Sequence, residues 1–402
     1  MIESISLKNF KAFKDVDMKD IPRFCVIVGA NGTGKSTIFH VLGFLRDAMA
    51  GNVNTALLKL GGSRGIKEVR TRGVAGNAPI EITIQYRTEK VVNSSNTQPL
   101  ITYHLKINEK NGKAYVEQER LSYRRGQHGS PWYFLDFSNG KGIAVTNEAA
   151  AVTDVSQLER EDQSLRSNDI LAIKGLAQFE RFPAVVALGE IIENWYVSDI
   201  HINKVRPDQE ANYAEHLSPE GENLSLVIQY LYNSHRKIFD KIIEKMKKRV
   251  PGISNVESKT TEEGNVLLKF QDGAFEDPFL AKFVSDGTIK MLAYLVLLND
   301  PNPYPLLCIE EPENQLYPKL LEELAEEFRE YANRGEQVMV STHSPDFLNA
   351  VKLEEVFWLE KKDGYTQIKR ASDDEQISAY MRDGDKMGYL WKQGFFGEVD
   401  PI

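Results

Sequence analysis

A glycine-rich segment between an apolar run and an amphipathic stretch constrains this chain more than any other feature. Residues 29–36 read Gly-Ala-Asn-Gly-Thr-Gly-Lys-Ser, which fits the pattern G-x-x-x-x-G-K-[ST]. Residues 24–28 are continuously apolar and predict a buried strand, and apolar residues recur at helical spacing over 37–49. A strand, a glycine turn and a helix in this order are the setting of a phosphate-binding loop. The sequence therefore predicts an α/β fold with a nucleoside triphosphate site.

The residue types of this loop suit the binding of phosphate. Glycines let the backbone curl so that successive N–H groups point at phosphate oxygens, and Lys35 supplies a mobile positive charge. The hydroxyl of Ser36 is a ligand for Mg²⁺. The predicted nucleotide contacts are Gly29, Ala30, Asn31, Gly32, Thr33, Gly34, Lys35, Ser36 and Thr37.

Two adjacent acids end a second predicted strand, at residues 306–309. Glu310 can hold Mg²⁺ directly or through water, and Glu311 is placed to polarise an attacking water. A third predicted strand, 337–342 (QVMVST), leads into His343, which we interpret as a sensor of the terminal phosphate. A lone histidine after a strand is more often structural, but its order and spacing after Glu311 favour this role. We therefore predict Glu311 and His343 as catalytic residues, and Ser36 and Glu310 as metal ligands.

A serine and a glycine open a long apolar helix just before the acidic strand. Residues 284–288 read Val-Ser-Asp-Gly-Thr, and residues 289–298 are almost entirely apolar. Backbone N–H groups at such a helix start can bind an anion. The remaining predicted nucleotide contacts are Ser285, Asp286 and Gly287 at this helix start, and Asn314 beyond the two acids.

In this order the segments resemble the motif set of ABC-type ATPases: Walker A, signature motif, Walker B with a catalytic glutamate, D-loop and switch histidine. The resemblance implies that ATP and Mg²⁺ are held between two copies in a head-to-tail dimer. Ser285 and Gly287 of one copy would then act on the site that Lys35 builds in the other. This chain has Asp286 where the commoner signature has a first glycine, so an acid is expected to face the nucleotide of the second copy.

Within that superfamily the chain is most similar to the SMC, RecF and OLD-like branch. Four segments carry this similarity: 5–13 (ISLKNFKAF), 29–32 (GANG), 310–314 (EEPEN) and 341–345 (STHSP). The variant at 285–288 and the closing segment 388–397 resemble a subgroup of bacterial AAA-type ATPases. Members of it serve in antiphage and abortive-infection systems such as PARIS, AbiL and Septu. This implies an ATPase switch that senses invasion and controls a separate toxic effector protein.

Other functions remain open at this stage. One is a RecF-like repair ATPase that clamps DNA, and another is a scaffold that holds ATP in a larger assembly with little turnover. Energising a transporter is the weakest alternative. The net charge of −9 argues against a surface that coats nucleic acid indiscriminately. The basic residues in 64–72 and 245–249 are interpreted first as solvated charge, and second as contacts to DNA or a phage component.

The motifs divide the chain into three predicted parts. Residues 1–165 form lobe I with an antiparallel β subdomain, because 80–86, 102–107 and 114–118 alternate polar and apolar residues. Residues 166–283 form a compact helical insert that is too short for a long coiled coil, and 284–402 form lobe II. Polar residues 138–168 are expected to return the chain to the second lobe. The family places a glutamine there on Mg²⁺ and the attacking water; we predict Gln163 for this metal-site role, with Gln85 and Gln178 as rivals.

Composition agrees with a large cytoplasmic ATPase head. Hydrophobic residues make up 42% of the chain, enough for a substantial core, and no run approaches the ~20 apolar residues of a membrane span. No membrane partner is therefore expected. Cys25 and Cys308 lie in predicted core strands that the family separates by a third strand, so we expect two free thiols. Fewer than 60 residues follow His343, which argues against the Toprim nuclease domain of OLD proteins.

Overall fold

A six-stranded central sheet positions the predicted motifs. The computed structural model describes residues 1–91, 97–125, 129–148 and 154–397. The order of the central sheet is β10-β15-β16-β3-β17-β18, and its neighbours are parallel except for the β17–β18 hairpin. These strands are β10 (Tyr196–Ser198), β15 (Leu306–Glu310), β16 (Gln337–Thr342), β3 (Phe24–Gly29), β17 (Val356–Lys362) and β18 (Tyr365–Arg370). Parallel pairing brings the carboxyl ends of β10, β15, β16 and β3 to one edge.

Both faces of this sheet are buried. In β3, Cys25 and Ile27 belong to one hydrophobic core, whereas Val26 and Val28 belong to a second core on the opposite face. Burial on both faces explains why the central strands read as continuous apolar runs. As predicted, β16 separates β3 from β15, and Cys25 and Cys308 are free and buried. Burial raises the pKa of both thiols, so they remain protonated.

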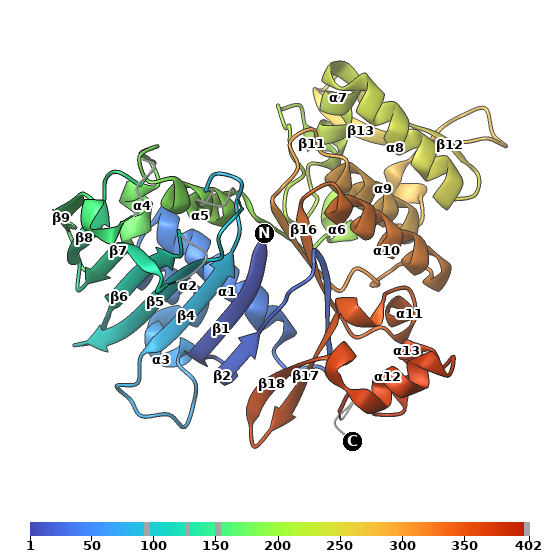
Figure 1. The fold of residues 1–402 in the computed structure, drawn as a ribbon. Coiled ribbons are helices and arrows are strands. Elements are labelled where there is room, and N and C mark those ends of the chain that lie inside the picture. The colour runs from blue at the N-terminus through green and yellow to red at the C-terminus, as the bar shows by residue number, and fades with distance from the viewer. Residues whose placement is uncertain (92–96, 126–128, 149–153, 398–402) are drawn as a thin grey trace.

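An eight-stranded antiparallel sheet forms the predicted β subdomain (Figure 1). In spatial order its strands are β2 (Phe13–Met18), β1 (Ile2–Phe10), β4 (Ile80–Tyr86), β5 (Ile101–Lys110), β6 (Lys113–Tyr123), β7 (Trp132–Ser138), β8 (Lys141–Val145) and β9 (Arg160–Ser164). Residues 138–168, expected to return the chain to the second lobe, contribute β8 and β9 to this sheet. Edge strand β9 is polar and mostly exposed, and so lacks the apolar alternation that reveals a strand.

Helices cover one face of this antiparallel sheet (Figure 1). They are α1 (Lys35–Ala50), α2 (Val53–Gly61), α4 (Ala172–Leu176) and α5 (Pro183–Asn194), and the short α3 (Ile66–Val69) follows α2. Two buried carboxylates join the sheet to α4 and α5. Glu119 accepts hydrogen bonds from the N–H groups of Ala172 and Ile173, and Glu148 accepts one from Ala184. The core of lobe I therefore continues to residue 195, beyond the predicted boundary at 165.

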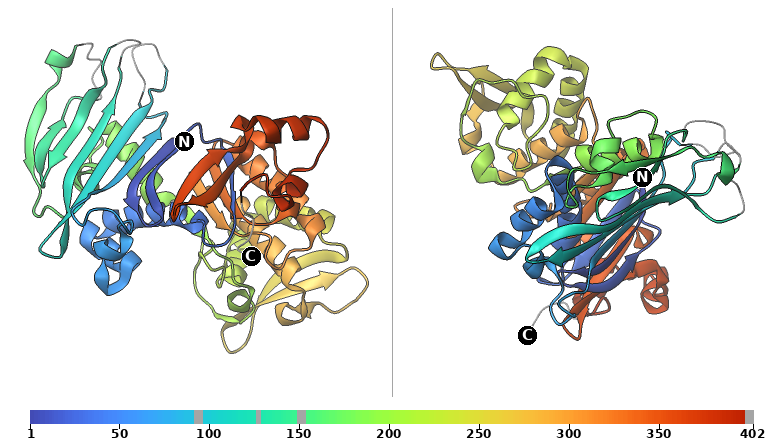
Figure 2. Two further views of the ribbon diagram at one scale, coloured as in Figure 1. Left: turned by 90° about the horizontal axis from the view of Figure 1, so that it is seen from below. Right: turned by 90° about the vertical axis from the view of Figure 1, so that its left-hand side faces the viewer.

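The other face of the central sheet carries a helical layer and a small sheet, on the side away from the antiparallel sheet (Figure 2). The helices are α6 (Ile202–Val205), α7 (Leu224–Ser234), α8 (Arg236–Arg249), α9 (Asp286–Leu298) and α10 (Pro318–Asn333). The small sheet contains β11 (Gln209–Glu210), β12 (Ile253–Thr260), β13 (Asn265–Asp272) and β14 (Phe279–Leu280). The insert is compact and forms no coiled coil, and His235 separates α7 from α8.

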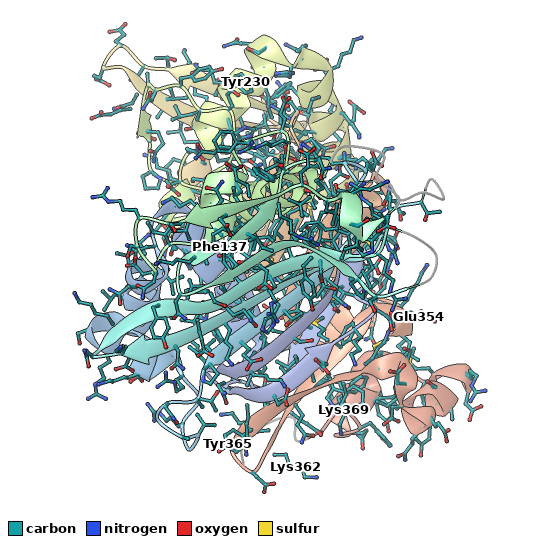
Figure 3. The ribbon with its side chains drawn as sticks, turned by 60° about the vertical axis from the view of Figure 1, so that its left-hand side comes forward. Phe137, Tyr230, Glu354, Lys362, Tyr365 and Lys369 are labelled. Carbon is teal, nitrogen blue, oxygen red and sulfur yellow. The ribbon has the colours of Figure 1, made fainter. Side chains whose placement is uncertain are left out.

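The C-terminal segment returns to lobe I through the β17–β18 hairpin. Figure 3 labels Lys362 and Tyr365 at the end of this hairpin. The Tyr365 hydroxyl donates to the Arg72 carbonyl at 3.3 Å, which ties the hairpin to lobe I. Helices α11 (Pro345–Leu348), α12 (Glu375–Arg382) and α13 (Met387–Lys392) complete the chain, and 3-10 turns occupy Gly62–Arg64, Val155–Gln157, Ala281–Phe283, Leu353–Glu355 and Ala371–Asp373. Within the described ranges, no helix is long and apolar enough to cross a membrane.

Candidate nucleotide-binding site

The glycine loop adopts the conformation that its sequence predicts. Strand β3 ends at Gly29 and α1 begins at Lys35. Gly32 and Gly34 have φ angles of 76° and 101°, in the left-handed region that favours glycine. A side chain at Gly29 would also collide with its own loop, because a Cβ there would lie 2.5 Å from Thr33 Oγ1. The loop therefore requires glycine at these positions to curl over the end of β3.

The ammonium group of Lys35 lies over this loop. Its Nζ donates to the Gly29 carbonyl at 2.8 Å, and the side chain is buried. Burial lowers the pKa of Lys35, and the carboxylates of Glu310, Glu311 and Glu313 oppose that effect. A buried cation whose hydrogen bonds go only to backbone carbonyls is suited to exchange them for the stronger bonds to phosphate oxygens.

Ser36 and Glu310 meet although 274 positions separate them in the sequence. The Ser36 hydroxyl donates to Glu310 Oε2 at 2.6 Å, which joins the start of α1 to the end of β15. Burial raises the pKa of Glu310, against the opposing effect of the Ser36 hydrogen bond. One hydroxyl and one carboxylate oxygen fit Mg²⁺, which takes one or two protein carboxylates and completes its shell with water and phosphate. The described residues contain no cluster of three or more His, Cys, Asp or Glu side chains that could hold a metal.

Glu311 and His343 are in direct contact. His343 Nδ1 lies 3.1 Å from Glu311 Oε1, and the Asn314 side-chain amide donates to Glu311 Oε2 at 3.1 Å. Burial alone would raise the pKa of Glu311, but the Asn314 hydrogen bond and the charge of His343 outweigh it and lower the pKa overall. Glu311 also has a φ of 42°, an uncommon left-handed conformation for a non-glycine residue. The site therefore holds an ionised carboxylate in a fixed orientation beside the Ser36–Glu310 pair.

Two further residues that the sequence analysis missed position this pair. Lys290 on α9 is almost fully buried, and its Nζ donates to the Asn314 carbonyl at 2.8 Å. Burial lowers the pKa of Lys290 to about 8. Glu313 accepts hydrogen bonds from the Thr342 hydroxyl at 2.7 Å and from the His343 backbone at 3.1 Å. A lysine within an otherwise apolar helix was the one available signal for Lys290.

A cavity of about 580 Å³ opens beside these groups. Its lining includes Asp199, His201, Lys290, Glu310 and Glu311. Asp199 directly follows β10, which pairs in parallel with β15, so it lies at the same sheet edge as Glu310. Its charge contributes to the raised pKa of Glu310. No local sequence pattern points to Asp199, because the strand that places it is only three residues long.

The structure corrects the position of Gln163. This residue lies on β9, the outermost strand of the antiparallel sheet, opposite Gly142. The other two glutamines are also poor candidates. Gln85 accepts a hydrogen bond from the Ser4 hydroxyl within that sheet, and Gln178 is exposed beyond α4. None of the three glutamines lines the cavity beside Glu310, so Gln163 is removed from the metal site.

The residues of the expected signature motif lie at the start of α9. Ser285 caps α9: its hydroxyl accepts from the Thr288 N–H at 3.3 Å. Gly287 packs against the segment after Asn314, where a Cβ would lie 3.1 Å from the Gln315 carbonyl. Asp286 is paired with Arg206. In the described chain, none of the three is among the residues that line the cavity beside Glu310, although Gly287 packs against Gln315, which does line it.

The two basic clusters are largely neutralised by neighbouring acids. Arg64 and Arg72 both pair with Glu68, and Lys67 and Arg70 both pair with Glu109. In the second cluster, ion pairs join Lys245 to Glu327 and Glu330, Lys247 to Glu244, and Arg249 to Glu323 and Glu327. This pairing agrees with the interpretation of both clusters as ordinary surface charge.

The fold and the site together define an ABC-type P-loop ATPase head of the SMC and RecF type. The chain belongs to the AAA_21 family, described as "AAA domain, putative AbiEii toxin, Type IV TA system", which matches residues 24–349. Over 101 residues, or 24% of its length, the chain is 30% identical to the DNA replication and repair protein RecF of Paenarthrobacter aurescens (strain TC1). The match spans only 25% of that relative's length.

Two solved structures share the fold. One is an SMC head bound to the C-terminal winged-helix domain of ScpA, with a TM-score of 0.54 and 15% identity over 92% of this chain and 97% of that one. The other is an Smc head with an extended coiled coil bound to the C-terminal domain of ScpA, derived from Pyrococcus furiosus. Its TM-score is 0.52 and its identity 14%, over 95% of this chain and 99% of that one.

Proposed function

We propose that this chain hydrolyses ATP with Mg²⁺ and works as a switch that closes and opens as a head-to-tail dimer. One observation carries the proposal: Ser36, Glu310, Glu311 and His343 converge at the carboxyl edge of the central sheet, beside the loop that holds Lys35. Hydroxyl, carboxylate, imidazole and ammonium groups in this arrangement are those that phosphoryl transfer to water requires.

Each group has a distinct task in this reaction. The loop amides and Lys35 bind and orient the phosphates of the substrate ATP. Ser36 and Glu310 hold Mg²⁺, which neutralises charge on the phosphates when it is bound. Glu311 is ionised and held by Asn314, so it can orient the attacking water and accept its proton. His343 contacts Glu311 and is placed to report on the terminal phosphate.

The second copy supplies the surface that one chain lacks. Ser285 and Gly287 stand at the start of α9 and do not line the cavity beside Glu310. In a head-to-tail dimer they would close on the nucleotide held by Lys35 of the other copy. Lys290 then links the two sites, because it joins α9 to the Asn314 carbonyl and Asn314 holds Glu311.

A regulatory role in antiphage defence is the output that we favour. The family description includes the words "putative AbiEii toxin, Type IV TA system", and the sequence resembles ATPases of antiphage systems. The described residues contain neither a metal cluster nor a membrane-crossing helix that would point to a second activity. We infer that the dimer controls a separate cytoplasmic effector protein.

Phosphate release tests the proposed reaction. Glu311→Gln should lower kcat by about 10²-fold or more, because it removes the general base but keeps the side-chain shape. Its affinity for ATP should be unchanged. Glu322→Gln makes the same substitution on an exposed position of α10 and should retain full activity. Equal turnover in the wild type and in Glu311→Gln would contradict the proposal.

A RecF-like DNA-clamping ATPase is the second candidate. The 101-residue match to RecF, at 30% identity, favours it, whereas the pairing of Arg70 and Arg72 with acids does not. This candidate predicts that duplex DNA stimulates phosphate release and that binding weakens steeply with salt. It also predicts that Arg72→Glu abolishes the stimulation, since the Arg72 side chain is 90% exposed. ATP binding without turnover would instead indicate a scaffold.

A further inference from the structure

Arg206 anchors the loop that leads into α9. Arg206 follows α6, and its guanidinium donates to the carbonyls of Ala281 and Val284, each at 2.8 Å. The same guanidinium is hydrogen-bonded to Asp286. A planar guanidinium can reach two carbonyls and a carboxylate at once, which the point charge of a lysine cannot do. Arg206 therefore contacts both the backbone before Ser285 and the acid directly after it.

The charge of Asp286 is a problem for the expected dimer. Its side chain is 44% exposed, at the first position of α9. An acid there interacts favourably with the helix dipole, but this same helix start is where a triphosphate from the second copy would bind. An unpaired carboxylate would repel that triphosphate. Arg206 is only 23% exposed and is ion-paired with Asp286, so it neutralises the acid.

We propose that Arg206 is a positioning residue for the signature loop: it fixes residues 281–286 in place and neutralises Asp286, so that α9 can accept the nucleotide of a second copy. This inference rests on the proposed dimeric function. It also explains why this chain has Asp286 where the commoner signature motif has its first glycine, because Asp286 and Arg206 act as a pair. Each is unfavourable without the other.

The segment that carries Arg206 also reaches the cavity beside Glu310. Asp199 lines the cavity beside Glu310, and only seven positions later Arg206 holds the loop before α9. Between them, the short helix α6 packs its buried Ile202 and Val205 into the second core. One compact segment therefore contacts both the cavity beside Glu310 and the loop that leads into α9.

The test uses the full chain with Glu311→Gln, so that hydrolysis does not reopen the dimer. The dimer dissociation constant is measured with ATP·Mg²⁺ by sedimentation. Arg206→Met should raise this constant by about tenfold or more, because it leaves a charged group unpaired. Adding Asp286→Gly should restore it to within about threefold of the starting variant, since the acid that needs neutralising is gone. ATP binding by the monomer should not change in either variant.

Controls separate this role from a general loss of stability. Arg236→Met removes an exposed ion pair with Asp240 on α8 and should leave the dimer unaffected. If the variant with both Arg206→Met and Asp286→Gly dimerises as weakly as Arg206→Met alone, neutralisation is refuted and Arg206 is merely structural. Dimerisation of Arg206→Met at the level of the control refutes the whole inference.

If ATP drives no dimer in any variant, the proposed function is refuted. A second measurement then tests whether Arg206 holds the loop. Hydrogen exchange of the amides of 284–288 in the monomer then reports on the anchor alone. Arg206→Met should speed this exchange about tenfold or more, because two carbonyl hydrogen bonds are lost. Unchanged exchange would show that Arg206 does not hold the loop.

Discussion

The buried carboxyl of Glu148 predicts a specific pH dependence of stability. Burial raises its pKa to about 7 from an ordinary value of 4.5, against the hydrogen bonds from the Tyr123 hydroxyl and the Ala184 N–H. Both bonds end on Oε1, and Oε2 has no hydrogen-bond partner among the described residues. Between pH 4.5 and 7 the folded chain therefore keeps a proton that the unfolded chain releases. The free energy of unfolding falls as pH rises through this window and then levels off.

The magnitude follows from the two pKa values. At 1.36 kcal/mol per pKa unit, keeping this carboxyl buried costs about 3 kcal/mol at pH 8 relative to pH 4.5. Glu148→Gln keeps an acceptor at the Oε1 position and cannot ionise, so it should not show this loss. We expect the variant to match the wild type near pH 5 and to be more stable by about 2–3 kcal/mol at pH 8.

Urea unfolding at pH 5, 6, 7 and 8 measures this difference directly. Glu119 is buried nearby with a similar raised pKa, but it titrates in both proteins and cancels in the comparison. Glu159→Gln, at an exposed position of the same lobe, serves as the control and should show no pH-dependent difference. A wild-type-to-variant difference that stays constant from pH 5 to 8 would refute the reasoning, because Glu148 would then not hold a proton in the fold.

Two further predictions concern the site and the C-terminal helices. Lys290→Met removes the hydrogen bond to the Asn314 carbonyl and should lower kcat about tenfold with unchanged ATP affinity, whereas a parallel loss of affinity would contradict a positioning role. Gly388→Ala should lower the free energy of unfolding by about 2–3 kcal/mol in urea, because its Cβ would lie 2.1 Å from the Pro345 carbonyl oxygen. Gly43→Ala, a helical position with no atom near its added Cβ, should cost nothing, and equal stabilities of the two variants would contradict the close packing of α13 on α11.

The parts of the site that the sequence revealed are those with local patterns. The glycine loop lies between a fully buried strand and an amphipathic helix. The spacing of apolar residues in these two flanking segments was enough to locate β3 and α1. Glu310 and Glu311 stood out because they directly end an apolar run. The contact of Glu311 with His343 depends on parallel pairing of β15 and β16, which the family resemblance implied.

The parts that the sequence did not reveal depend on non-local pairing. Asp199 reaches the site through a three-residue strand that pairs with a strand more than 100 positions away, and no local pattern signals such a pairing. Gln163 was placed at the site because its strand has the polar composition of a loop. The pairing of Arg206 with Asp286 spans 80 positions in the sequence. Residue type identified the groups, but only the fold determined which of them meet.

The mass of Glu311→Gln in solution, with and without ATP·Mg²⁺, tests the central claim most directly. A matched sample also carries Ser285→Arg, which places a bulky side chain at the start of α9 and leaves Lys35 untouched. The account predicts that ATP·Mg²⁺ doubles the mass of Glu311→Gln, whereas the variant with Ser285→Arg binds ATP and stays a monomer. A chain that remains monomeric with ATP, or a dimer that forms regardless of ATP and of Ser285, would contradict a site completed by a second copy.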